Sequence, residues 1–257
     1  MDEPQFDTIL VEVAGDRGAL TLNRPEKLNP LSMHTLYELE AAARWFDSHH
    51  ELKIVVVSGA GRTMSAGADL STFAGGSVER EDRDQGRRMA KAVEEMRAVT
   101  IAKMHGWCVG GGLVLAAACD LRIAAESARF SIPEVDIGIP LAWGAIPRLV
   151  REIGPAMTKE LVMTCRPFTP AEAKAAGFLN HVVPDDRLDA EVEELVATLT
   201  AKAKYALLAT KAHVNSVAEA MASTGRNWSD ADALGAGLTD PESRQKAREY
   251  LERHRSR

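Results

Sequence analysis

Two glycine-containing turns are the places in this sequence where the backbone itself can do chemistry. The first is Met64-Ser-Ala-Gly-Ala-Asp-Leu70 and the second is Gly106-Trp-Cys-Val-Gly-Gly-Gly112. The triple glycine opens a helical pattern, and the first amides of a helix lack internal acceptors and favour negative charge. With an amide from residues 66–68, they predict an oxyanion hole of two donors. Close packing at a helix start is the alternative explanation for either turn alone.

A carboxylate stands in a mostly apolar stretch, Phe130-Ser-Ile-Pro-Glu-Val-Asp-Ile-Gly138. Burial of Glu134 in such surroundings would raise its pKa, which suits a general base or acid. Asp136 lies two residues further and would point elsewhere if the segment is extended. A Glu134 that faces solvent or caps a turn is the alternative interpretation.

Other sites of common chemistry are absent from the sequence. Neither glycine turn continues as G-x-G-x-x-G or ends in Gly-Lys-Ser/Thr, and no Gly-x-Ser-x-Gly elbow occurs. The seven histidines have no ligand spacing, so we expect no metal site. Cys108, Cys119 and Cys165 suggest no disulfide framework, and we expect them to be buried as small apolar side chains.

The glycine turns and the segment of Glu134 are positioned by the strands and helices that the sequence predicts around them. Ser32 can cap a helix over 33–46, and the continuous apolar run at 54–57 predicts a strand buried on both faces. Strand, glycine-rich turn and helix in repetition predict an α/β domain whose backbone amides converge at strand ends. The strands are expected at 8–13, 19–22 (forming a hairpin), 54–57, 101–104 and 121–124.

The remaining segments are a polar stretch, an irregular stretch and a helical arm. Residues 75–88 predict a charged surface loop before an amphipathic helix, and residues 127–153 read as irregular. From Pro170 onward the pattern is helical, so its apolar stripe must be covered by the core or by another copy of the chain. The expected helices are 170–176, 188–202, 205–222 and 241–253, with a short strand at 180–183.

The charge and the apolar content of the sequence disfavour some classes of binding partner. The 257 residues contain 31 Lys+Arg against 37 Asp+Glu, a net charge of -6, which disfavours nucleic acid as a partner. No apolar run approaches the roughly 20 residues of a membrane span. The first residues do not form a signal peptide. We therefore expect a cytoplasmic protein that binds neither nucleic acid nor membrane.

Five motifs follow one another along most of the chain. They are Leu22-Asn-Arg-Pro-Glu-Lys-Leu-Asn29, Ser65-Ala-Gly-Ala-Asp-Leu70, Gly106–Gly112 with Cys119-Asp-Leu-Arg122, Phe130–Gly138 and Thr169–Phe178. Together and in this order they resemble the enoyl-CoA hydratase/isomerase (crotonase) family. The resemblance implies a crotonase-like core of ββα units forming a spiral over residues 1–195, and a C-terminal helical oligomerisation region over 196–257 that builds a trimer or a hexamer. It implies an acyl-CoA thioester as the ligand, with coenzyme A as part of the substrate and no other cofactor.

The same resemblance assigns roles to single residues. The amides of Ala68 and Gly111 would hold the thioester carbonyl, which acidifies C2 and stabilises an enolate. Arg24, Lys27 or Arg62 would meet the phosphates. On their charge alone, Lys202, Lys204 and Lys211 of the helical arm are candidates to contact a neighbouring subunit's coenzyme A. The coenzyme A surface would comprise Lys27, Leu28, Ala66, Ala68, Asp69, Leu70 and Gly111.

The carboxylates depart from the hydratase pattern. Hydratases of this family carry two glutamates, and the matching positions here are Val114 and Glu134. Water addition uses both, whereas moving a proton between two carbons needs one carboxylate within reach of each. The arrangement resembles the Δ3,Δ2-enoyl-CoA isomerases. Dienoyl-CoA isomerases add two aspartates, where this chain has Val114 and Ala142.

We therefore expect an enoyl-CoA isomerase in which Glu134 shuttles the proton. A hydratase with an atypical site and a non-catalytic acyl-CoA-binding protein are the alternatives. Asp136 is assigned a structural role. Trp143 stands where the family is rich in glycine, and we expect it to reshape the acyl pocket. Acyl-chain length, pathway and the choice between trimer and hexamer stay open.

Overall fold

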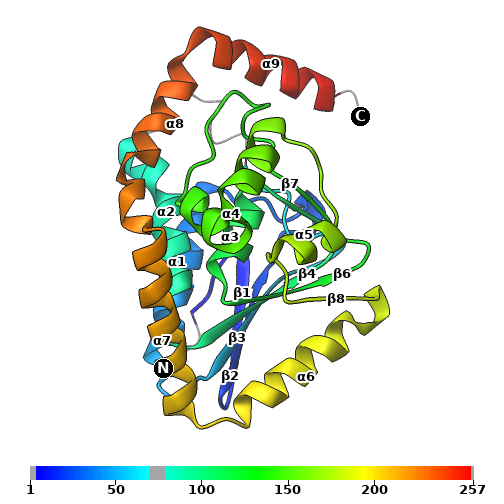
Figure 1. The fold of residues 1–257 in the computed structure, drawn as a ribbon, viewed down its shortest axis with the longest axis vertical. Coiled ribbons are helices and arrows are strands. Elements are labelled where there is room, and N and C mark those ends of the chain that lie inside the picture. Colours follow the sequence, from blue (N-terminus) through cyan, green and yellow to red (C-terminus); the bar gives the residue numbers. More distant parts are fainter. Residues whose placement is uncertain (1–3, 70–78, 256–257) are drawn as a thin grey trace.

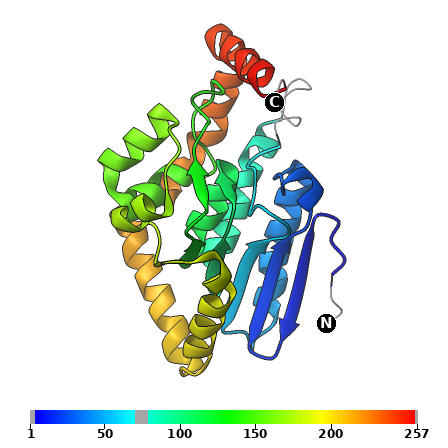
Figure 2. The ribbon, with the colours of Figure 1, turned by 90° about the vertical axis from the view of Figure 1, so that its right-hand side faces the viewer.

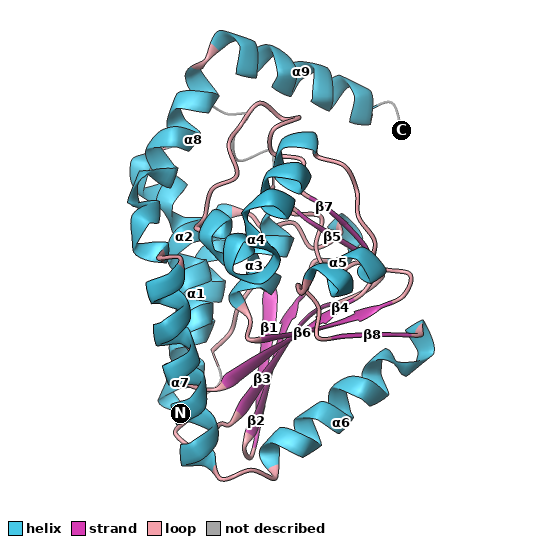
Figure 3. Cartoon of the chain, in the orientation of Figure 1, coloured by secondary structure: helices cyan, strands magenta, loops and turns pink. Residues whose placement is uncertain are grey.

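A six-stranded sheet forms the centre of the fold (Figure 1). The computed structural model describes residues 4–69 and 79–255. The strand order is β1-β2-β3-β4-β6-β8; β1 and β2 form an antiparallel hairpin, and the other pairs are parallel. A separate parallel pair is formed by β5 and β7 (Figure 3). The predicted α/β class is confirmed. The strands are β1 (Ile9–Ala14), β2 (Arg17–Leu22), β3 (Ile54–Gly59), β4 (Val99–Met104), β5 (Trp107–Val109), β6 (Leu121–Ala125), β7 (Arg129–Ser131) and β8 (His181–Val183).

Some of the described helices begin at a side-chain cap that the sequence supplies. Ser32 accepts a hydrogen bond from the Thr35 amide, and Thr169 forms a reciprocal capping box with Glu172. The α-helices are α1 (Met33–Ser48), α2 (Arg80–Glu95), α3 (Gly111–Ala118), α4 (Ala145–Thr164), α5 (Pro170–Ala176), α6 (Leu188–Thr200), α7 (Lys204–Met221), α8 (Asp230–Thr239) and α9 (Pro241–Arg255). Short 3-10 turns are η1 (Pro25–Lys27), η3 (Asp185–Arg187) and η4 (Thr224–Ser229).

Helices cover both faces of the parallel part of the sheet. Along β3, Val55 and Val57 join the larger core with α1 and α3, whereas Ile54 packs with α6 on the opposite face. Alternate side chains of a strand point to opposite faces, so the apolar run is buried on both, as predicted. The free thiols of Cys108, Cys119 and Cys165 are also buried, as expected.

The chain winds in repeated steps of two strands and a helix. In the step β4-β5-α3 and again in β6-β7-α4, the first strand joins the large sheet and the second joins the small one. Isolated bridges, Leu31 with Ala68 and Ser65 with Cys108, continue this small layer toward the N-terminal side. The ββα core is thereby confirmed. Its consequence is that the segments following β2, β3 and β4 lie side by side.

The C-terminal helices lie along one side and one end of the molecule. The helices α7 and α8 follow one side and α9 crosses the end (Figure 1), while β1 and β2 lie at the flank opposite α7 (Figure 2). The predicted boundary at residue 195 falls inside α6, and the division into two regions stays a prediction. No described helix is both long and apolar enough to cross a bilayer.

Two sequence predictions were wrong. The stretch 75–88 is not all loop, because α2 begins at Arg80; Glu81 and Asp82 suit a helix start, while residues 70–78 lie outside the described part. The stretch 127–153 contains β7 and the start of α4, which accepts Pro147 in its first turn. The helix α8 was not predicted, since its two glycines weaken the helical signal.

Lys211 fastens α7 to the core of its own chain. Its side chain is 7% exposed, pairs with Asp120 at 2.7 Å and donates to the carbonyl of Ala98 at 2.8 Å. Lys204 pairs with Glu51, which is largely exposed. These contacts give Lys211 a structural role in this chain, and contact of the helical-arm lysines with a neighbour's coenzyme A stays a prediction.

Replacing Lys211 with Met should lower the free energy of unfolding by about 2 kcal/mol, because Asp120 loses its buried cationic partner. The matched change Lys204→Met removes an exposed pair and should cost less than about 0.5 kcal/mol. Urea unfolding followed by circular dichroism measures both values. Equal losses in the two variants would contradict this role for Lys211.

Candidate active site

Three backbone segments are joined by hydrogen bonds at the ends of β2, β3 and β4. The Ala66 amide donates to Leu28 and the Leu31 amide to Gly67, both at 2.8 Å. The Ser65 amide donates to Trp107 at 3.1 Å on the other side. The Ser65 hydroxyl donates to the Asn29 carbonyl and accepts from the Gly67 amide. The first glycine turn is therefore held firmly between its two neighbours.

The predicted amide pair is brought together beside this turn. Gly111 begins α3, and a Cβ placed on it would lie 3.3 Å from the Ala68 nitrogen. Neither the Ala68 nor the Gly111 amide donates to any residue in the described part of the chain. Buried amides without an acceptor are rare in folded proteins. The two N–H groups can therefore bind an oxygen that carries developing negative charge.

Each of the three glycines at the start of α3 meets a close neighbour. Gly110 has φ 45° and ψ -113°, and a Cβ there would lie 2.4 Å from Oε1 of Glu134. A Cβ on Gly112 would lie 2.7 Å from that of Ser65. The glycines thus serve close packing, and this packing brings the amides and the carboxylate to one place.

Glu134 lies in a tight turn and not in an extended segment. Its carbonyl accepts hydrogen bonds from the amides of Ile137 and Ile139. The expectation for an extended Asp136 does not apply, because the turn carries Asp136 to an exposed position. The turn aims the Glu134 carboxylate at Gly110, where the triple glycine begins.

The surroundings of the Glu134 carboxyl favour its protonated form. The residue as a whole is partly buried, but Oε2 is inaccessible and has no hydrogen-bond partner among the described residues. Burial raises the pKa of Glu134 to about 7. A carboxyl with this pKa can take up and release a proton near neutral pH.

The amide pair and the carboxylate line one small cavity of about 30 Å³. Glu134 is the one titratable side chain among its described lining residues, and Val114 and Ala142 lie in the same wall. The space holds about two water molecules. The lining residues are Ala68, Gly111, Val114, Glu134, Ile139, Pro140, Leu141, Ala142, Trp143 and Leu234.

Two of the residues predicted to bind coenzyme A, Ala68 and Gly111, belong to the wall of this cavity. Lys27 is exposed, Leu28 is half-buried, and Ala66 and Asp69 are tied by their amides to Leu28 and Leu31. Leu70 lies outside the described residues. These positions agree with one continuous surface, and their role in binding stays a prediction.

Three basic side chains come from two loops that Asn29 holds together. The Asn29 side chain donates to the carbonyls of Ala60 and Thr63, both at 2.8 Å. Arg24 and Lys27 belong to the first loop and Arg62 to the second. None of the three forms an ion pair with a described residue. They can therefore meet an anionic group such as a phosphate.

Residues of the C-terminal helices also reach the site, which was not predicted. Leu234 of α8 lines the cavity, and Asp230 accepts a hydrogen bond from the Gly144 amide at 2.8 Å. In α9, burial together with the charges of Asp136 and Glu134 raises the pKa of Tyr250. A helical pattern shows which residues face inward but not which part of the core they meet, so no sequence signal could have identified them.

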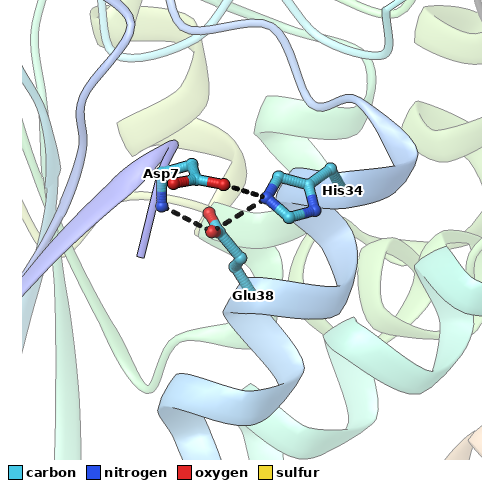
Figure 4. A group of neighbouring side chains, drawn as sticks. All are labelled: Asp7, His34 and Glu38. Atoms are coloured by element: carbon cyan, nitrogen blue, oxygen red, sulfur yellow. Dashed lines mark hydrogen bonds and ion pairs between the residues drawn. The ribbon is translucent and has the colours of Figure 1, made fainter. Parts of the chain in front are cut away.

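One cluster of side chains could hold a metal ion by its composition, and it lies elsewhere. Asp7, His34 and Glu38 form this group among the described residues (Figure 4). Glu38 accepts from the amides of Asp7 and Thr8 and from the Thr8 hydroxyl, so its oxygens are already satisfied. The cluster is explained by its role in fastening the segment before β1 to α1.

Comparison with known proteins gives consistent matches over most of the chain. The family model for enoyl-CoA hydratase/isomerase matches residues 18–256. A Mycobacterium bovis protein named as a probable enoyl-CoA hydratase is 34% identical over 225 residues, which are 86% of each chain. The peroxisomal Δ3,5-Δ2,4-dienoyl-CoA isomerase of Arabidopsis thaliana is 35% identical over 208 residues, 75% of each chain.

The fold is likewise similar to solved structures. The crystal structure of an enoyl-CoA hydratase from Mycobacterium avium subsp. paratuberculosis superposes with a TM-score of 0.87 at 25% identity. The superposition covers 95% of this chain and 99% of that one. The similarity therefore extends over nearly the whole fold.

The pKa of Glu134 makes stability depend on pH. Because burial raises it from 4.5 to about 7, the folded state binds this proton more tightly than the unfolded chain does. The stabilisation is fully present below pH 4.5 and is lost as the pH rises through 7. Relative to Glu134→Gln, the wild type should lose about 3 kcal/mol of unfolding free energy across that window. Urea unfolding of both proteins at a series of pH values measures it, and a constant difference would refute it.

Proposed function

The chain belongs to the enoyl-CoA hydratase/isomerase family, and from this premise we propose that it moves the double bond of an enoyl-CoA from C3=C4 to C2=C3. The thioester carbonyl lies between the amides of Ala68 and Gly111. The observation that carries the proposal is the cavity itself, whose described wall offers one carboxylate, Glu134, with Val114 at the position of the second.

Each part of the site has a defined task in this reaction. The Glu134 carboxylate removes a proton from C2, and the electron pair moves toward the thioester oxygen. The two amides stabilise the resulting enolate because they donate to the oxygen where the charge develops. The protonated Glu134 then returns the proton to C4, and the double bond forms between C2 and C3. A pKa of about 7 supports both halves of this transfer.

We further propose that coenzyme A lies along the loops of residues 24–29 and 60–69. Its phosphates are met by Arg24, Lys27 and Arg62, and no other cofactor takes part. The absence of competing ion pairs for these three side chains among the described residues supports this placement.

The chain is proposed to work in the cytoplasm as a homo-trimer or hexamer. Exposed apolar side chains on α7 support the assembly, among them Tyr205 at 87% and Met221 at 75% exposure. A single copy leaves these side chains in water, and burial against a neighbouring copy would remove them from it.

Hydration of a 2-enoyl-CoA is the second candidate. It is favoured by the name of the Mycobacterium bovis relative and by a cavity with room for water. Hydration needs one group to deprotonate water and another to protonate C2. In the described cavity wall, Glu134 would have to do both.

The decisive variant for isomerisation is Glu134→Gln, which keeps the shape of the side chain and removes its proton chemistry. With a 3-enoyl-CoA as substrate, kcat should fall by about 10²- to 10⁴-fold, because the base is lost while the amides remain. The formation of the conjugated 2-enoyl thioester, followed by its ultraviolet absorbance, measures the rate.

The matched control is Asp136→Asn, two residues away on the same turn but exposed. It should leave kcat within about twofold of the wild type. Equal activity of Glu134→Gln and the wild type would refute the proposed role of Glu134. Rapid loss of absorbance with a 2-enoyl-CoA, without isomerisation of the 3-enoyl-CoA, would establish the hydratase instead.

A further inference from the structure

Trp143 occupies an unusual position at the cavity. Its side chain is buried, and its backbone has φ 61°, a left-handed conformation that is rare for a bulky residue. The indole ring lies against Gly111, where a Cβ would be 2.4 Å from its Cζ3 atom. The ring is thus packed directly beside one of the two amide donors.

A glycine in the middle of α2 makes room for this ring. A Cβ on Gly86 would lie 2.1 Å from the indole Cδ2 atom, so no larger residue fits while the ring stays in place. Glycine in a helix interior costs about 1 kcal/mol relative to alanine. Packing this one aromatic ring therefore reduces stability twice, through the glycine inside α2 and through the left-handed backbone of Trp143.

The backbone around Trp143 is held from two sides. The next residue, Gly144, donates its amide to Asp230 of α8 at 2.8 Å. Its carbonyl accepts from Arg148 of α4 at 2.9 Å, and Arg148 is itself paired with Glu94. With these contacts the ring forms a fixed wall of the cavity.

We infer that Trp143 limits the length of the acyl chain that this cavity accepts. This inference rests on the proposed function, because it places the thioester carbonyl at Ala68 and Gly111. The remaining space of about 30 Å³ lies among apolar side chains that include Leu141 and Leu234. The indole forms part of the wall of this space, so a smaller side chain at position 143 would leave more room for acyl atoms beyond the carbonyl.

The test is the affinity of saturated acyl-CoA thioesters, which bind without being isomerised. Calorimetry compares butyryl-CoA with octanoyl-CoA on the wild type and on Trp143→Gly, in which glycine suits the left-handed backbone. The wild type should bind butyryl-CoA at least about tenfold more tightly than octanoyl-CoA. In the variant octanoyl-CoA should gain at least about tenfold, since more methylene groups become buried.

A second variant at position 143 and a control at another tryptophan separate an effect on the cavity from a general loss of folding. Trp143→Leu retains an apolar side chain and should shift the octanoyl-to-butyryl ratio in the same direction. Trp45→Leu removes a tryptophan of α1 that does not line the cavity, and should leave the ratio unchanged.

Two outcomes would overturn the inference. One is equal affinity of the wild type for both thioesters, and the other is an unchanged ratio in both Trp143 variants. If the ratio shifts as expected but no 3-enoyl-CoA is isomerised, then the proposed reaction fails while the role of Trp143 stands. If isomerisation is observed and the ratio does not shift, only the role of Trp143 fails.

Discussion

The close approach of α3 to the turn at residues 65–68 is the constraint on which the site depends. Side chains at Gly110, Gly111 or Gly112 would collide with Glu134, Trp143 or Ser65. Because these positions carry no side chain, two amides without acceptors and one carboxylate share a cavity of about 30 Å³. The proposed oxyanion site, the proposed proton carrier and the inferred limit on substrate size all depend on this one packing arrangement.

This arrangement has a cost that the fold must offset. A buried carboxyl oxygen without a partner and two amides without acceptors are unfavourable in a folded chain. The surrounding hydrogen bonds of Ser65 and Asn29 hold the loops in place nevertheless. In the proposed reaction these unsatisfied groups gain partners when the substrate binds, so the features that reduce stability are the ones that would stabilise an enolate.

Much of the site was predictable because its residues belong to short motifs that are contiguous in the sequence. Each of these motifs contains residues that are unusual in their surroundings. They are the glycines at the start of a helix, the small residues of the turn before Ala68, and Glu134 in an apolar stretch. The parts that were missed depend on tertiary contacts: Leu234 and Asp230 are ordinary helix residues until α8 packs beside the cavity. Likewise Gln85 of α2 is buried and donates hydrogen bonds to Leu36 and Glu40 of α1, a tertiary contact that the polar composition of 75–88 does not reveal.

The central claim is that Glu134, with one carboxyl oxygen inaccessible to solvent, carries one proton between two carbons of an enolate held by two amides. The most direct measurement uses a 3-enoyl-CoA with deuterium at C2 and locates the label in the product by nuclear magnetic resonance. The account predicts that a measurable share of the deuterium removed from C2 appears at C4. A product whose C4 has received hydrogen from water alone would contradict it.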